Sequence, residues 1–251
     1  MPGYKLLTRA HVFSAAVIGS MVPDFGLILP RDPTRIETHS LVGLFTFCLP
    51  VGLVGYWLTQ LLIKPSVLET LPDNAYLRLR SAHPAASLTK LKTWFTVSGA
   101  LLFGAMTHVV WDAFTHENAR GVRALPFLSD YGPELDGHPL HVYRWLQYGS
   151  SVLGLGVVAI ALILWVRHAP AAASPPPRRI PRDERRVWLW LYLLPPTVEL
   201  VWTLWRTRWM MSFEPYPISW LLSSAAIATL RGAVVSLLFI SALMRIRLAS
   251  A

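Results

Sequence analysis

The segment GAMTHVVWDAFTHE, residues 104–117, carries three polar side chains at helical spacing. His108, Asp112 and His116 are four residues apart, so on an α-helix they lie along one stripe of its surface. Imidazole nitrogens and carboxylate oxygens bind divalent zinc, manganese or iron without a cysteine. Two ligands at positions i and i+4 hold a fixed geometry, as in the helical HExxH motif. The stripe is therefore a candidate metal site, and the alternative is a capping or hydrogen-bonded pair at a helix end.

The composition indicates that this stripe belongs to a membrane protein. Of the 251 residues, 53% are hydrophobic and 15% are charged, whereas soluble domains average about 25% charged residues. We therefore predict an all-α, polytopic transmembrane helical bundle in which residues 1–251 form a single membrane domain. The one cysteine, Cys48, excludes both an intrachain disulfide and a cysteine metal cluster.

The apolar stretches predict about six membrane-spanning segments. A spanning helix needs about 20 mostly apolar residues, and five stretches meet this length: 41–63, 93–111, 145–166, 187–205 and 218–244. The fourth of these contains Pro195 and Pro196, which predict a kink. A sixth segment, 12–29, is interrupted by Pro23 and Asp24. It is either a short span or a helix that stops before it crosses.

The charges of the loops predict the orientation of these segments. The loop 64–92 holds five basic and two acidic residues, and the loop 167–186 holds six basic and two acidic residues. Segment 112–143 is the reverse, with two basic and five acidic residues. We predict that the protein lies in the cell inner membrane. With six crossings, the positive-inside rule places both termini in the cytoplasm. Residues 169–186 are then a Pro-rich, basic cytoplasmic loop.

The net charge of +9 could also suggest a nucleic-acid partner. The basic loops carry no nucleic-acid-binding motif, however, and serve more simply as topology signals. We expect the lipid bilayer as the partner of this protein and expect no nucleic-acid partner.

The predicted topology brings further polar residues to the outer end of the stripe. Asp24 ends the first segment there, and His39 opens the second. His138 and His141 precede the fourth span on the same side, and we interpret them as loop residues rather than ligands. Segments far apart in the sequence thus converge, which strengthens the metal-site hypothesis over a lone HxxxD pair.

Four stretches together resemble a known family: AAVIGSMVPDFG, THSLVGLFTFCLPVGL, GAMTHVVWDAFTHE and YRWLQYGSSVLGL. They resemble the bacterial integral-membrane family called domain of unknown function 4184, over most of residues 10–165. That family is distantly similar to inner-membrane metal-dependent hydrolases, in which GSxxPD, THS and HxxxD segments recur. The resemblance implies that four residues are the metal ligands: Asp24, His39, His108 and Asp112.

These observations predict a metal-dependent hydrolase that acts at the membrane surface on a phosphoester or lipid-linked substrate. His116 or Glu117 would assist proton transfer. The alternative is a non-catalytic structural or partner-binding membrane protein. A small transporter is less favoured, because the remaining spans offer mainly Glu199 and Arg231 as charged residues. We predict that these two form an ion pair, unless Glu199 instead faces the outer site.

Overall fold

The fold is known from a computed structural model, which describes residues 10–28, 33–82, 90–135, 137–170, 180–211 and 218–250. The long helices are α8 (Leu91–Thr115), α10 (Val142–His168), α11 (Arg182–Met211) and α12 (Ile218–Ala249). The shorter α-helices are α2 (Ala10–Met21), α3 (Arg35–His39), α4 (Leu41–Gly43), α5 (Leu49–Leu58), α6 (Lys64–Thr70), α7 (Asp73–Ala82) and α9 (Arg120–Ala124). The π-helical segments η2 (Leu44–Cys48) and η3 (Thr59–Ile63) join α4, α5 and α6. The 3₁₀ segments are η1 (Val22–Ile28) and η4 (Pro126–Ser129).

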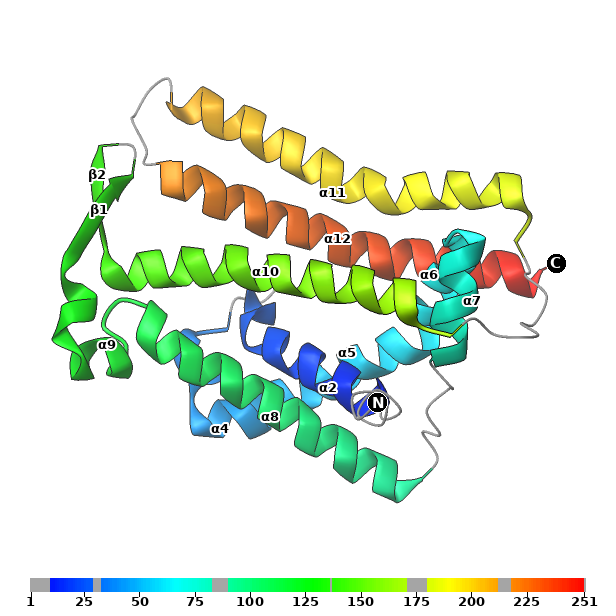
Figure 1. The fold of residues 1–251 in the computed structure, drawn as a ribbon, viewed down its shortest axis with the longest axis horizontal. Helices are drawn as coiled ribbons and strands as arrows, with labels where there is room; N and C mark the ends of the chain where they lie inside the picture. The colour runs from blue at the N-terminus through cyan, green and yellow to red at the C-terminus, as the bar shows by residue number, and fades with distance from the viewer. Residues whose placement is uncertain are drawn as a thin grey trace.

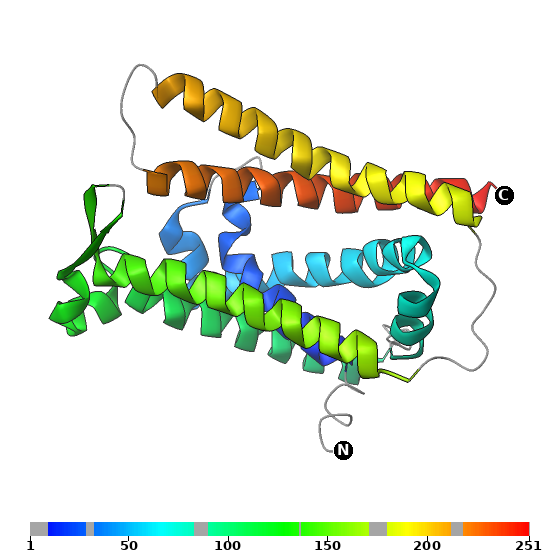
Figure 2. The same ribbon diagram turned by 45° about the horizontal axis from the view of Figure 1, so that its top comes forward.

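The helices form three layers (Figures 1 and 2). One layer is the pair α11 and α12, and the opposite layer is α8 with α10. Between them lie α2 and the α4–α6 segment. A two-stranded antiparallel hairpin, β1 (Tyr131–Leu135) and β2 (His138–His141), leads into α10. The predicted all-α helical bundle is therefore confirmed, with this hairpin as a small addition.

Five of the predicted spans are matched by helices that are long and apolar enough to cross a membrane. They are 41–70, 91–115, 142–168, 182–211 and 218–249, each longer than its predicted counterpart. The first segment is different, because its apolar part covers only Val12–Ile28 and changes from α-helix to 3₁₀ helix after Met21. Pro23 has no amide hydrogen for an α-helical bond. This segment is therefore not among the five helices long enough to span, and its crossing of the membrane stays a prediction.

Glycines allow α2 and α8 to pack in parallel at very short range. A Cβ atom at Gly19 would overlap the backbone carbonyl of Leu101, and one at Gly104 would overlap that of Ala16. Both helices run in the same direction, because Ala15 clusters with Val97 of α8, whereas Asp24, just after α2, reaches His108. Small residues are the usual means by which membrane helices approach closely. This packing sets the end of α2, and hence Asp24, beside the last turns of α8.

The pair α11 and α12 contains the predicted proline kink. Pro195 and Pro196 lie inside α11, which bends near its middle (Figure 1). Gly232 of α12 packs there, since a Cβ on it would come within 2.6 Å of the Cα of Pro196.

The predicted ion pair between Glu199 and Arg231 is wrong. Arg231 instead donates a hydrogen bond from Nε to the carbonyl oxygen of Leu27, at 2.7 Å. In the part of the chain that the structure describes, no ion pair joins the two residues. The 3₁₀ segment η1 lies beside α12 and offers Arg231 a closer acceptor.

The predicted loop 169–186 falls partly outside the described residues, which omit 171–179. On either side of that gap Ala169 and Ile180 are buried. Ile180 packs with Tyr192, Ile240 and Met244 in one hydrophobic cluster. The loop is therefore anchored at both of its described ends.

Candidate functional site

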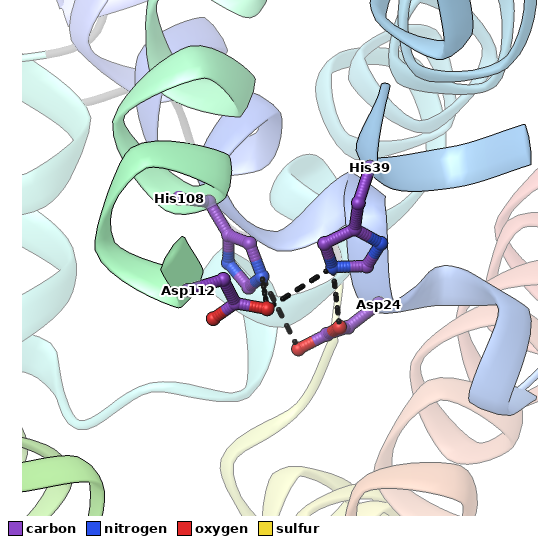
Figure 3. A group of neighbouring side chains, drawn as sticks. All are labelled: Asp24, His39, His108 and Asp112. Carbon is purple, nitrogen blue, oxygen red and sulfur yellow. Dashed lines mark ion pairs between the residues drawn. The ribbon is translucent and has the colours of Figure 1, made fainter. Parts of the chain in front are cut away.

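Three segments bring four ligand-type residues together (Figure 3). Asp24 comes from η1, His39 ends α3, and His108 and Asp112 lie one turn apart on α8. One donor atom of each residue lies within 4.8 Å of the donor atoms of the other three. His39 Nε2 is 3.2 Å from Asp112 Oδ2 and 3.5 Å from Asp24 Oδ1. His108 Nε2 is 3.5 Å from Asp24 Oδ2 and 3.6 Å from Asp112 Oδ2. The structure thus brings together the four residues that the sequence indicated.

The two imidazole nitrogens in this cluster lie within ion-pair distance of carboxylate oxygens but make no hydrogen bond of good geometry. Nε2 of His39 and Nε2 of His108 are buried, and neither has a hydrogen-bond partner within the described chain. Such orphaned buried atoms are rare and call for an explanation such as an ion. Both nitrogens face the same two carboxylates (Figure 3). Two imidazole nitrogens and two carboxylate oxygens are a donor set suited to a divalent metal.

A capping box positions His39. The side chain of Thr34 accepts from the amide of Glu37, while Glu37 Oε2 accepts from the amide of Thr34 at 2.7 Å. This reciprocal pair begins a helix at the sequence TRIE. The helix α3 then places Arg35 and His39 four residues apart on one face.

A hydrogen bond fixes the ring of His39. Its Nδ1 lies 2.6 Å from the hydroxyl of Thr38, which leaves Nε2 directed at the carboxylates. The backbone of Thr38 is held in turn, because its carbonyl accepts from Cys48 Sγ at 3.3 Å. Partners of this kind orient metal-binding histidines in other proteins.

Arg35 is the site residue that we did not predict. Its Nη2 donates to Asp112 Oδ2 at 2.8 Å, and its side chain remains 49% exposed. The capping-box signature beginning at Thr34 could have revealed it, because that signature puts Arg35 on the same helical face as His39. The guanidinium adds a positive charge at the open edge of the cluster.

His39 has a raised pKa. Burial alone would lower the pKa of its imidazole, but the nearby carboxylates of Asp112 and Asp24 outweigh burial and raise it. The protonated form is therefore favoured until the pH exceeds the ordinary histidine value of 6.5. Protonated imidazole cannot bind a metal.

We expect metal affinity at this site to rise with pH. A metal must displace the proton from His39, whose pKa lies above 6.5, so binding should strengthen over the interval from pH 6.5 upward and release protons to the buffer. Isothermal titration with zinc at several pH values, in buffers of different ionisation enthalpy, measures both effects. An affinity independent of pH over that interval would show that His39 is not a ligand.

An open cavity of about 670 Å³ lies against the cluster, between α8 and α10. Asp24, His108 and Asp112 line it, together with His116 just beyond α8. Nδ1 of His116 is 3.5 Å from Asp112 Oδ1, and its Nε2 is 3.3 Å from the side-chain nitrogen of Gln147. Burial lowers the pKa of His116, and the nearby Arg35 adds to this effect. His116 is therefore neutral near pH 7 and faces the space that a substrate could enter.

The other candidates lie elsewhere. Glu117 is exposed in the turn after α8, outside the described lining of the cavity. His138 is exposed in β2. His141 donates a hydrogen bond from Nδ1 to the carbonyl oxygen of Ser129 at 2.7 Å, and it stacks on Tyr131 and Tyr143. His138 and His141 thus lie in strand β2 rather than in a loop as we predicted, and neither belongs to the four-residue cluster.

Comparison with known proteins gives one match. Neither the curated proteins nor the solved structures include a protein that matches this chain. The family described as "Domain of unknown function (DUF4184)" matches residues 2–242, which is nearly the whole chain and includes all four residues of the cluster. The chain therefore belongs to the DUF4184 family.

Proposed function

We propose that this protein is a metal-dependent hydrolase whose site opens at one surface of a membrane. The metal ligands are Asp24, His39, His108 and Asp112. The observation that carries this proposal is the pair of buried Nε2 atoms that face two carboxylates at 3.2–3.6 Å without forming a hydrogen bond of good geometry. In a purely structural cluster, such nitrogens would be expected to find hydrogen-bond partners.

The donor set fits zinc, manganese or iron, because it combines neutral nitrogens with anionic oxygens and contains no sulfur. When bound, such an ion lowers the pKa of water and polarises an ester bond. Two carboxylates balance the charge of a divalent ion. The contacts that orient His39 and Asp112 are already in place.

His116 is the proton-transfer residue in this proposal. It is neutral near pH 7, lines the cavity and lies beside Asp112 without belonging to the four-residue cluster. A neutral imidazole can accept a proton from an attacking water and return it to a leaving group. Glu117, the second residue predicted for this role, is exposed and is a weaker candidate.

The substrate class that we propose is a phosphoester, free or linked to a lipid. Arg35 supplies a half-exposed guanidinium next to the cluster, and guanidinium groups bind phosphate oxygens in a bidentate manner. The cavity also offers the hydroxyls of Ser150 and Ser151 and the ring of Trp111. A site at the end of spanning helices is within reach of lipid headgroups.

We further propose that the protein lies in a bacterial inner membrane with both termini in the cytoplasm. This orientation rests on the basic residues of the loops and requires the α2–η1 segment to cross. The parallel packing of α2 on α8 supports that crossing, because Asp24 of η1 reaches the same end of the bundle as His108.

A hydrolysis assay with a His116→Gln variant tests the function. The wild-type protein with zinc or manganese should hydrolyse a chromogenic phosphodiester. The variant should lose about a hundredfold in kcat, because general acid–base catalysis contributes roughly that factor, and it should keep its metal. If the metal-loaded wild type hydrolyses neither phosphomonoesters nor phosphodiesters above the rate of free metal, the hydrolase proposal is wrong.

A non-catalytic structural role is the second candidate. The observation that favours it is that the same cluster joins η1, α3 and α8 through close charged contacts. In that case His108→Ala should lower the unfolding temperature of metal-free protein, whereas a ligand role predicts a change in metal affinity with little change in the metal-free fold.

A further inference from the structure

A second cavity, of about 390 Å³, lies between α11 and α12. Its charged lining residues are Glu199 and Arg206 of α11 and Arg231 of α12. Its apolar walls include Trp202 and Ile227. Both helices are long and apolar enough to cross a membrane. The cavity thus places three charged side chains within a pair of candidate spans.

The cavity occupies only one half of the helix pair. Toward the opposite ends the helices are closed by hydrogen bonds, from Ser236 Oγ to the carbonyl of Tyr192 at 2.6 Å and between the Tyr192 and Ser241 hydroxyls at 2.8 Å. The contact of Gly232 with Pro196 ends this closed region. Beyond it, toward Met211 and Ile218, the two helices lie apart in both views (Figures 1 and 2). The bend at the prolines therefore creates the cavity.

The charges in this cavity are left largely unneutralised. Arg231 uses Nε for the carbonyl of Leu27, and the structure gives the rest of its guanidinium no partner among the described residues. Within the same described residues, Arg206 and Glu199 make no hydrogen bond or ion pair. Two guanidinium groups and one carboxylate give a net positive charge. Charged groups within a membrane span are costly unless a partner or a polar cavity receives them, and they mark binding sites.

We propose that this cavity binds the phosphate-bearing headgroup of an anionic membrane phospholipid. Guanidinium groups match phosphate oxygens in geometry and charge. A lipid fits better than a free anion, because the walls continue into apolar surface that faces the bilayer, where Trp202 is 56% exposed. Acyl chains can lie along that surface while Arg206 and Arg231 hold the headgroup. The negative charge of Glu199 repels the anionic headgroup and limits the affinity of the cavity for it.

This site shares no residue with the metal cluster, so it does not depend on the proposed hydrolase activity. The two sites are nevertheless neighbours in the fold. Arg231 binds the backbone of η1 at Leu27, three residues from Asp24.

Native mass spectrometry of the full chain in detergent tests the proposal, with dioctanoyl phosphatidylglycerol and dioctanoyl phosphatidylcholine as the added probes. We expect one phosphatidylglycerol to be retained, with a preference of about tenfold over phosphatidylcholine. Arg206→Gln should lower its retention about tenfold. Glu199→Gln should raise it. Arg208→Gln is the matched control, because Arg208 is exposed on the same helix outside the described lining of the cavity, and it should change nothing.

Circular dichroism of each variant establishes that the helices remain folded. Retention in Arg206→Gln equal to that of the wild type would overturn the proposal. An equal loss in Arg208→Gln would also overturn it, since the effect would then be general surface charge. An arm with inorganic phosphate distinguishes the source of the anion: if phosphate at the same concentration displaces the lipid, the cavity binds a free anion and the lipid assignment is wrong.

Discussion

Replacing His108 by alanine is expected to weaken divalent-metal binding about a hundredfold while the helical fold remains. Structural zinc sites with four ligands contribute about 10–16 kcal/mol, so one ligand carries roughly 3 kcal/mol, which is about a hundredfold in affinity. His108 supplies a buried Nε2 that faces Asp24 and Asp112 and makes no hydrogen bond to the described residues. Its removal also leaves Asp24 and Asp112 facing each other across the empty space. Competition with a fluorescent zinc chelator measures the affinity.

The control for this experiment is His138→Ala. His138 is also a histidine near the same end of the fold, but it is exposed in the β-hairpin and lies outside the cluster. Its replacement should leave the affinity unchanged. Equal affinities of the wild type and His108→Ala would remove His108 from the ligand set, and an equal loss in both variants would indicate non-specific binding by surface histidines.

Replacing Gly104 by alanine is expected to destabilise the protein by about 3 kcal/mol, at the upper end of overpacking effects. The new methyl group would overlap the carbonyl oxygen of Ala16 and come within 2.7 Å of the Ser20 amide nitrogen. Both obstacles are backbone atoms, so α2 as a whole must move away from α8. Because η1 follows α2 directly, Asp24 should move away from His108, and metal affinity should fall as well. Unfolding in detergent by denaturant measures the stability.

Gly99→Ala is the matched control on the same helix. A Cβ at Gly99 would meet no described atom within 4 Å, so this substitution should leave stability the same or raise it slightly, since alanine favours helix over glycine. If Gly104→Ala is as stable as Gly99→Ala, the close packing of α2 on α8 is not present in solution.

The long helices could be predicted from the sequence because their signal is compositional. The run 142–168 has one of the highest hydropathies in the chain and needs no knowledge of its neighbours. The segment 12–28 was harder, because Pro23 and Asp24 indicated an interruption but not that the chain continues as a 3₁₀ helix to Ile28. The positions of the five long helices were therefore predicted from the sequence, whereas the change from α-helix to 3₁₀ helix in the first segment was not.

The four clustered residues could be predicted because each lies near one end of an apolar segment. The spacing of His108 and Asp112 showed that they share a helical face, and topology suggested the proximity of Asp24 and His39. Arg35 was missed because it lies in a short polar connection where hydropathy carries no signal. The ion pair of Glu199 with Arg231 was wrong for a related reason: sequence gives the depth of a residue along a helix, but not which neighbour lies beside it.

Elemental analysis of the wild-type protein tests the metal site most directly. The protein is purified in detergent, exposed in turn to equal concentrations of zinc, manganese and iron, and freed of unbound ions. We predict one divalent ion per chain, lost on mutation of His39 or Asp112 and kept in His138→Ala. A folded, metal-exposed wild-type protein that carries no ion above the background of the buffer would contradict the site, and the cluster would then be a contact between helices.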